Sequence, residues 1–179
     1  PRAPVLIDGV LRCGHKLMVA AQSKAGKTWM LLELAVSVAS GEPWLGHEIR
    51  QPGSVLYVNL EIDEPSCYDR IMRICRAIGV NPHAMADLDV WPLRGAQLMM
   101  PAILSALRES GKGYSLIIVD PIYKVNDGDE NSAADMARFC SMLDALASST
   151  GAAVAFAHHF AKGSAGGKAA MDRASGSGV

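Results

Sequence analysis

The chain has 179 residues, of which half are apolar and one fifth are charged. This length corresponds to one domain of ordinary size, and this composition excludes an intrinsically disordered chain. The 17 basic and 18 acidic residues give a formal net charge of −1, which excludes a strongly basic tail but allows a local basic patch. The apolar runs are too short, and too often interrupted by polar residues, to cross a bilayer.

The chain contains four cysteines, at positions Cys13, Cys67, Cys75 and Cys140. Their spacing includes no C-x-x-C pair and no Cys/His cluster of the kind that binds zinc, so it predicts buried, reduced thiols in a cytoplasmic protein. The chain begins at Pro1 rather than at Met and ends in GSGV. We therefore expect a single domain over 1–179 that is cut short at its C-terminal end, with a mobile loop or tail over 160–179.

Short β-branched runs alternate with longer stretches that have helical periodicity. In chain order we expect a strand at 16–21, a helix at 28–40, a strand at 54–60, a helix at 64–78, a strand at 88–91, a helix at 101–109, a strand at 114–120, a helix at 132–149 and a strand at 152–158. The strands are near-continuous apolar runs, which is typical of parallel strands covered on both faces. The first two helices stop before Gly41 and Gly79, and the second has Pro65 in its first turn, as helices favour.

Strands and helices in alternation predict an α/β fold, an open parallel sheet with right-handed crossovers and helices on both faces. In such sheets, ligands bind beyond the carboxyl ends of the strands. The last residue of each predicted strand, and the loop after it, are therefore the expected location of the functional residues.

The first predicted strand runs into AQSKAGKT, residues 21–28, and a helix follows directly. Gly26, Lys27 and Thr28 match the end of the phosphate-loop pattern G-x-x-x-x-G-K-[ST], and Ala21 replaces its leading glycine. Such a turn aims backbone N–H groups and the positive helix end at a phosphate. We expect Lys27 to bridge the β- and γ-phosphates and Thr28 to offer its hydroxyl to Mg²⁺.

The predicted nucleotide-binding set is Ser23, Lys24, Ala25, Gly26, Lys27, Thr28 and Trp29. A chance match in a tight turn is the alternative, and the flanking strand and helix disfavour it.

An acidic residue ends the fourth predicted strand, where Asp120 follows four apolar residues. A carboxylate is costly to bury inside a parallel sheet, so we expect Asp120 at the strand tip, where it would bind Mg²⁺ through water. An ordinary cap of the following turn is the alternative.

A second acidic residue, Glu61, follows the strand predicted at 54–60. A carboxylate beside the phosphate loop can orient and polarise an attacking water molecule, so Glu61 is the candidate general base. Asp63 and Glu64 come soon after it, and either of them can cap the next helix. A solvated loop glutamate is the alternative for Glu61.

Two histidines, His158 and His159, end the last predicted strand. Adjacent residues of a strand point to opposite sides, so this pair is unsuited to binding one metal ion. At a strand tip beside the phosphates, one of them could donate a hydrogen bond to the γ-phosphate and respond to its loss. The sequence does not show which of the two histidines does so. A structural role for the pair is the alternative.

Taken together, the motifs resemble those of RecA-like P-loop ATPases. The most similar family is the plasmid RepA-type replicative DNA helicases, with the related AAA-type ATPases of phages and mobile elements. The resemblance extends over nearly the whole chain. The motifs that carry it are AQSKAGKT, VLYVNLE, LIIVDPIY, GDEN at 128–131, AHHFAKG at 157–163 and DRASGSGV at 172–179.

The resemblance implies a RecA fold and a ring of identical subunits, usually a hexamer, with ATP bound between subunits. By motif position it assigns phosphate and Mg²⁺ contacts to Lys27 and Thr28, the Walker B acid to Asp120, the catalytic base to Glu61 and the phosphate sensor to His158 or His159. Arg173 falls where such proteins place residues that act across a subunit interface, so it could reach the γ-phosphate of a neighbour. A mobile surface side chain is the alternative for Arg173.

Contact with single-stranded DNA is expected from the same resemblance, in loops that face the centre of the ring. The first loop, 124–131, has three acidic residues and one lysine, a composition that repels a phosphate backbone. The second loop, 160–178, places Lys162, Lys168 and Arg173 among glycines, which suits a loop that follows a strand of DNA. Plain disorder explains this composition equally well.

Two other functions compete with a DNA motor. A P-loop kinase for a small molecule would need an arginine-rich lid over the phosphates. The candidate segment contains Arg70, Arg73 and Arg76 at intervals of three residues, and its pattern predicts an amphipathic helix instead. The second competitor is a regulatory or recombination-associated ATPase that forms a ring without unwinding DNA. Stimulation of ATP turnover by single-stranded DNA distinguishes the motor from this regulator.

Overall fold

The computed structural model describes residues 2–96, 99–110, 113–122 and 133–159. All nine predicted elements are present, with ends that differ from the prediction by at most two residues, and a short hairpin precedes them. The elements in chain order are β1 (Val5–Ile7), β2 (Leu11–Arg12), β3 (Lys16–Ala21), α1 (Lys27–Ser40), β4 (Val55–Asn59), α2 (Glu64–Ile78), β5 (Leu88–Pro92), α3 (Met100–Ser110), β6 (Leu116–Asp120), α4 (Ala133–Thr150) and β7 (Ala153–His159).

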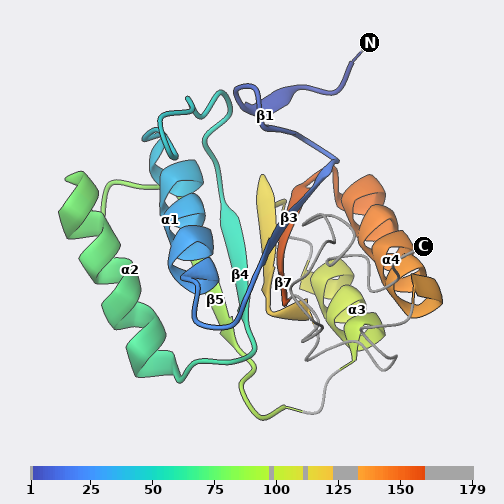
Figure 1. The fold of residues 1–179 in the computed structure, drawn as a ribbon. Coiled ribbons are helices and arrows are strands. Elements are labelled where there is room, and N and C mark those ends of the chain that lie inside the picture. The colour runs from blue at the N-terminus through green and yellow to red at the C-terminus, as the bar shows by residue number, and fades with distance from the viewer. Residues whose placement is uncertain (1, 97–98, 111–112, 123–132, 160–179) are drawn as a thin grey trace, which may run out of the picture.

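Five parallel strands form the central sheet in the order β3-β7-β6-β4-β5. Helices α1 and α2 cover one face of the sheet, and α3 and α4 cover the other (Figure 1). This arrangement is the α/β architecture of a RecA-like P-loop NTPase, as predicted. The last strand along the chain, β7, lies between β3, which leads into the phosphate loop, and β6, which carries Asp120.

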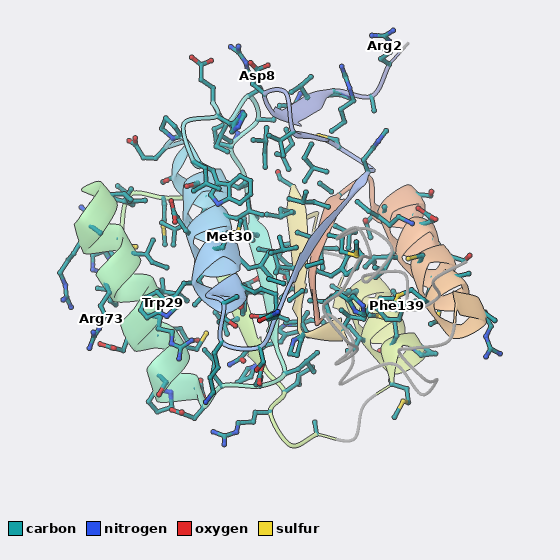
Figure 2. All side chains as sticks on the ribbon, in the orientation of Figure 1. Arg2, Asp8, Trp29, Met30, Arg73 and Phe139 are labelled. Atoms are coloured by element: carbon teal, nitrogen blue, oxygen red, sulfur yellow. The ribbon has the colours of Figure 1, made fainter. Side chains whose placement is uncertain are left out.

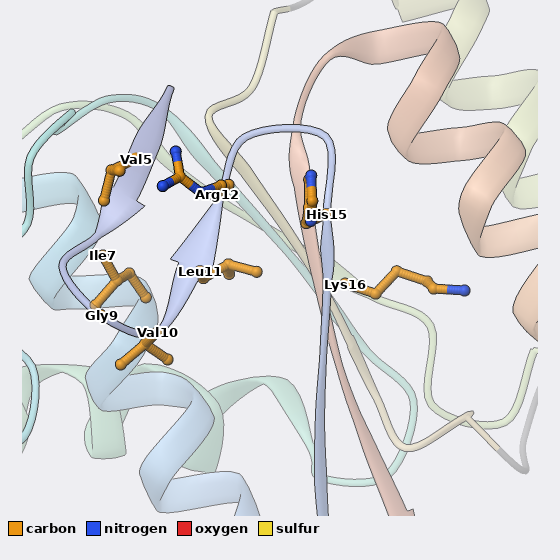
Figure 3. A pocket seen from close by; sticks show the side chains of 8 residues that line it. All are labelled: Val5, Ile7, Gly9, Val10, Leu11, Arg12, His15 and Lys16. Atoms are coloured by element: carbon orange, nitrogen blue, oxygen red, sulfur yellow. The ribbon is translucent and has the colours of Figure 1, made fainter. Parts of the chain in front are cut away.

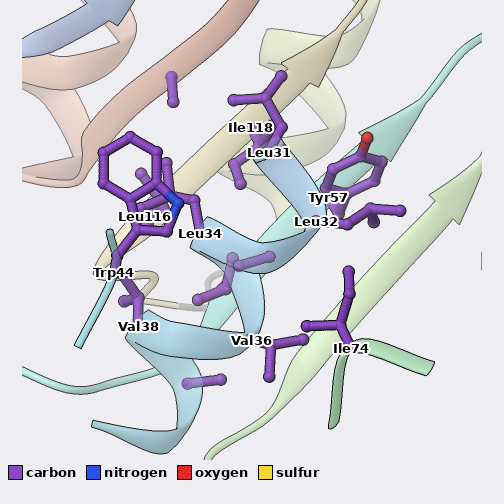
Figure 4. Packing of buried hydrophobic residues seen from close by; sticks show 14 of the residues in the cluster. Leu31, Leu32, Leu34, Val36, Val38, Trp44, Tyr57, Ile74, Leu116 and Ile118 are labelled. Atoms are coloured by element: carbon purple, nitrogen blue, oxygen red, sulfur yellow. The ribbon is translucent and has the colours of Figure 1, made fainter. Parts of the chain in front are cut away.

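Two hydrophobic clusters, one on each face, hold the layers together. Successive residues of a strand point to opposite faces, so Tyr57 of β4 packs on the α1 side and Val58 packs on the α3 side. Figure 4 shows the α1 side, where Leu31 and Leu34 of α1 belong to the same cluster as Leu116 and Ile118 of β6. Burial on both faces explains why the strands read as continuous apolar runs in the sequence.

The antiparallel hairpin of β1 and β2 was not predicted. Strands of three and two residues are too short to show an alternating pattern. The hairpin lies at the end of the molecule away from the connection between β3 and α1 (Figure 1).

The four cysteines differ in burial. Cys67 and Cys75 of α2 are buried, as predicted, whereas Cys13 and Cys140 are partly exposed, and all four are free thiols. Within the described ranges, no helix has the length and apolar character needed to span a membrane.

Candidate functional site

The carboxyl ends of the five parallel strands meet at one edge of the sheet, at the bottom of Figure 1. Three predicted segments converge there: the loop from β3 to α1, the turn from β4 to α2, and the end of β6. Parallel strands place their carboxyl ends together, so the fold gathers residues that are far apart in the chain.

The loop before α1 has the backbone of an anion-binding turn. Gly26 is the N-cap residue, with a φ of 87°, and Lys24 also has a positive φ, of 62°. A left-handed backbone at the N-cap suits glycine, because other L-residues meet a steric penalty there. No side chain caps α1, and its first turn contains no acidic residue. The positive end of α1 therefore faces the loop without a negative group from its own first turn.

Lys27 is the first residue of α1, and its side chain is only 7% exposed. Its Nζ donates hydrogen bonds to the carbonyl oxygens of Ala21 and Gln22, at 2.9 and 2.8 Å. Burial lowers the pKa of Lys27, and the carboxylates of Asp120 and Glu61 partly oppose this effect. The structure thus brings the predicted phosphate-binding lysine within electrostatic reach of both predicted carboxylates.

Asp120 ends β6 and is only 4% exposed. Its carboxylate accepts a hydrogen bond from the Tyr57 hydroxyl, at 2.5 Å to Oδ2, and another from the Thr28 hydroxyl. Burial raises the pKa of Asp120, these two hydrogen bonds and the charge of Lys27 oppose the rise, and Glu61 adds to it.

The contact between Asp120 and Thr28 suits the metal that the phosphate-loop motif implies. Both side chains present oxygen atoms, the donors that Mg²⁺ prefers, and Mg²⁺ normally takes its remaining ligands from phosphate and water. These two residues therefore fit a magnesium ion bound together with a nucleotide.

Glu61 lies in the turn after β4, two residues beyond the end of the strand, and is exposed. The side chain of Asn59 holds this turn: its Nδ2 donates to the carbonyl of Ile62 at 2.8 Å, and its Oδ1 accepts from the Ile62 N–H at 3.1 Å. Asn59 is buried and was missed in the sequence. Its signal is a polar residue at the end of an otherwise apolar strand.

Asp63 is the N-cap of α2. Its Oδ1 accepts a hydrogen bond from the Ser66 N–H at 2.9 Å, and these contacts hold the pKa of Asp63 below its usual range. Of the two acids that could cap this helix, Asp63 does so, and Glu64 lies in the first turn. Capping therefore does not involve Glu61.

The two histidines lie beside the strand that leads into the phosphate loop. The register of β3 and β7 pairs Ala20 with His158 and Ala21 with His159. His158 is buried and, by strand alternation, shares the α3 face of the sheet with Phe156, opposite to the α1 face of Tyr57. Only the backbone of His159 is described. A phosphate-sensing role for either histidine stays a prediction.

A protein-family model described as an AAA domain matches residues 1–165. The chain belongs to this AAA domain family. Membership agrees with the P-loop NTPase fold described above and indicates nucleotide binding and ATPase activity. AAA domains often assemble into oligomers.

Trp29, next to Thr28 in this AAA domain, contacts α2. The guanidinium carbon of Arg70 lies 5.1 Å from the centre of the Trp29 ring, which is a cation–π distance. Figure 2 shows Trp29 between α1 and α2, and Trp29 is 39% exposed. Arg73 instead pairs with Asp69 on α2 itself. Arg70 thus contacts Trp29 of α1, whereas Arg73 pairs within α2.

A cavity of about 380 Å³ lies at the other edge of the AAA domain (Figure 3). It is lined by β1, β2 and the start of β3, and Leu11, Arg12 and Lys16 are among its residues. Since β3 runs from Lys16 to Ala21, the cavity and the phosphate loop lie at opposite ends of this strand.

Several predicted residues fall outside the described ranges. These are Arg173, the loop at 124–131 and the basic segment at 162–173. Among the residues that the structure does describe, no group of three or more His, Cys, Asp or Glu side chains is arranged to hold a metal ion.

Proposed function

We propose that this AAA domain hydrolyses ATP in the presence of Mg²⁺ and uses the energy to move along single-stranded DNA, as a subunit of a hexameric ring of the RepA type. One observation carries the ATPase part of the proposal. Lys27, Asp120 and Glu61 come from three separate segments and interact electrostatically at one edge of the sheet, and Thr28 is bonded to Asp120.

In the proposed reaction, a water molecule attacks the γ-phosphorus while Glu61 accepts its proton. The bond between the γ-phosphorus and the oxygen bridging to ADP breaks, and ADP and inorganic phosphate are the products. Lys27 balances the negative charge on the β- and γ-phosphates, and the N–H groups at the start of α1 hold the phosphates in place.

Thr28 and Asp120 are the residues that would hold Mg²⁺, which supplies positive charge to the phosphate oxygens when bound. The low exposure of Asp120 and Lys27 strengthens their interactions, because less water screens them. His158 or His159 is the proposed sensor of the γ-phosphate.

The motor part of the proposal rests on the order of motifs along the chain. The histidine pair with Lys162, and the segment that contains Arg173, resemble the corresponding motifs of RepA-type helicases. We assign to Arg173 a role in stabilising the γ-phosphate of a neighbouring subunit, and to Lys162 and Lys168 contacts with the DNA backbone.

The test is ATP hydrolysis by the full-length protein, with and without single-stranded DNA, across a range of salt concentrations. We expect Mg²⁺-dependent release of phosphate that single-stranded DNA stimulates and that salt weakens. Turnover that DNA leaves unchanged would favour a regulatory ATPase. A requirement for a phosphate acceptor would favour a kinase. A protein that stays monomeric with ATP at high concentration would contradict the role of Arg173 across an interface.

A further inference from the structure

Tyr57 places a hydroxyl group inside the hydrophobic cluster that joins α1 to the sheet. Its side chain has no exposed surface, and it packs in the same cluster as Leu31, Leu32 and Ile118 (Figure 4). A buried hydroxyl is costly unless it is hydrogen-bonded. Here the hydroxyl donates to Oδ2 of Asp120, at 2.5 Å.

Packing alone accounts for the ring of Tyr57 but not for its hydroxyl. Of the neighbouring positions that face the same way, Val55 on β4 and Leu116 and Ile118 on β6 are apolar, whereas Asn59 and Asp120 at the ends of these strands are polar. A phenylalanine would fill the same space without a polar atom to satisfy. A tyrosine hydroxyl is protonated at neutral pH, so it can donate to the carboxylate.

The bond from Tyr57 leaves Asp120 attached to two other elements of the fold. Asp120 ends β6, Tyr57 holds Oδ2 from β4, and Thr28 bonds to the carboxylate from the first turn of α1. A carboxylate held on two sides cannot rotate independently. Mg²⁺ requires near-ideal octahedral geometry, so the orientation of this carboxylate affects how well the ion binds.

We propose that Tyr57 is a positioning residue, whose hydroxyl fixes the orientation in which Asp120 meets the magnesium ion of bound Mg·ATP. This inference rests on the proposed function, because it requires that Mg·ATP binds at this edge of the sheet. Because its side chain has no exposed surface, Tyr57 would not touch a bound nucleotide. It acts through Asp120 alone.

The chain contains a matched control, the tyrosine–aspartate pair of Tyr114 and Asp89. The Tyr114 hydroxyl donates to Oδ2 of Asp89 at 2.8 Å, and the Tyr114 side chain is also largely buried. Tyr114 precedes β6, and Asp89 lies near the start of β5, so this pair sits at the edge of the sheet away from the phosphate loop. Tyr57→Phe and Tyr114→Phe each remove one hydroxyl from a similar bond, and only the first touches Asp120.

The experiment titrates Mg²⁺ against binding of a fluorescent, non-hydrolysable ATP analogue to the full-length protein. We expect Tyr57→Phe to raise the Mg²⁺ concentration needed for half-maximal binding by about tenfold or more, and Tyr114→Phe to leave it unchanged. Binding of the analogue in EDTA should be the same in all three proteins. Melting temperatures should fall by similar amounts in both variants, since each loses one buried hydrogen bond.

Tyr57→p-aminophenylalanine supplies the rescue, because it keeps a donor in the same place. It should return the Mg²⁺ requirement toward the wild-type value. If Tyr57→Phe does not fold, Tyr57→4-fluorophenylalanine, which keeps the ring but has no donor, takes its place in the comparison with Tyr114→Phe. Equal Mg²⁺ requirements for Tyr57→Phe and Tyr114→Phe would overturn the role of Tyr57 and leave the proposed function standing. A wild-type protein that binds no ATP analogue at any Mg²⁺ concentration would overturn both.

Discussion

Helices α1 and α2 begin at the same edge of the sheet and cover the same face, but their N-termini are built differently. The N-terminus of α2 is closed by its own sequence: Asp63 caps it, Glu64 adds a negative charge, and Pro65 has no N–H group to satisfy. The N-terminus of α1 has Gly26 as its N-cap residue, with no capping side chain and no acidic residue in its first turn. The chain therefore satisfies the positive end of α2 with its own side chains, whereas the positive end of α1 suits an anionic ligand.

Removing the ammonium group of Lys27, the first residue of α1, should have the largest effect. Lys27→Ala should lower kcat/KM for ATP by about 10³–10⁵-fold, because it removes both a charged contact to bound phosphate and stabilisation of the transition state. Equilibrium binding of an ATP analogue measures the lost contact to phosphate, and steady-state hydrolysis measures the lost stabilisation of the transition state. Lys16→Ala, at the other end of β3, is the control and should keep wild-type kinetics. Unchanged affinity in Lys27→Ala would refute the assignment of the phosphate loop.

The turn that leads into α2 offers the next test, because it contains two acids with different assigned roles. Glu61→Gln should lower kcat by about 10²–10⁴-fold while the affinity for ATP stays near that of the wild type, since only the proton acceptor is lost. Asp63→Asn keeps a capping side chain and should leave kcat unchanged. Single-turnover hydrolysis with separately measured binding distinguishes these outcomes. Normal hydrolysis by Glu61→Gln would exclude Glu61 as the base.

A pair of glycine substitutions separates backbone strain from ligand binding. Gly26 and Gly79 both have positive φ, of 87° and 76°, and an added Cβ would meet no atom within 4 Å at either position. Gly26→Ala and Gly79→Ala should therefore each destabilise the fold by about 1–2 kcal/mol, which is a drop in Tm of about 2–8 °C. Only Gly26→Ala should also weaken nucleotide binding. Equal affinities in the two variants would contradict a role for the Gly26 backbone in holding phosphate.

The smallest effect is expected from the cap of α2. The folded state lowers the pKa of Asp63, so the stabilising effect of its charge is present above the usual pKa and is lost as the pH falls through the folded-state value. Asp63→Asn keeps the cap without the charge, so its Tm should lie slightly below that of the wild type at pH 7. Melting curves should converge as the pH falls below about 4. A difference in Tm that does not change with pH would show that the charge of Asp63 contributes nothing.

Much of the site could be predicted because its residues follow strands with strong apolar patterns. The segments around Gly26 and Asp120 stand out as polar groups at the ends of buried runs, and the structure places Lys27 and Asp120 within electrostatic reach of each other. Tyr57 and Asn59 were missed, because a tyrosine in an apolar strand resembles core packing and an asparagine at its end resembles a turn residue. Only the position of the neighbouring strand and turn shows what their polar atoms contact.

From the sequence alone we could predict the alternation of strands and helices, the caps at Gly41 and Gly79, and the phosphate-loop motif. These features depend on local periodicity and backbone preference, which a single segment of chain contains. The tertiary structure alone decided that β7 inserts between β3 and β6, that Asp63 rather than Glu64 caps α2, and that Tyr57 bonds to Asp120. These outcomes depend on which strands pair and which side chains meet across them. Such contacts join residues distant in the chain, and no local pattern encodes them.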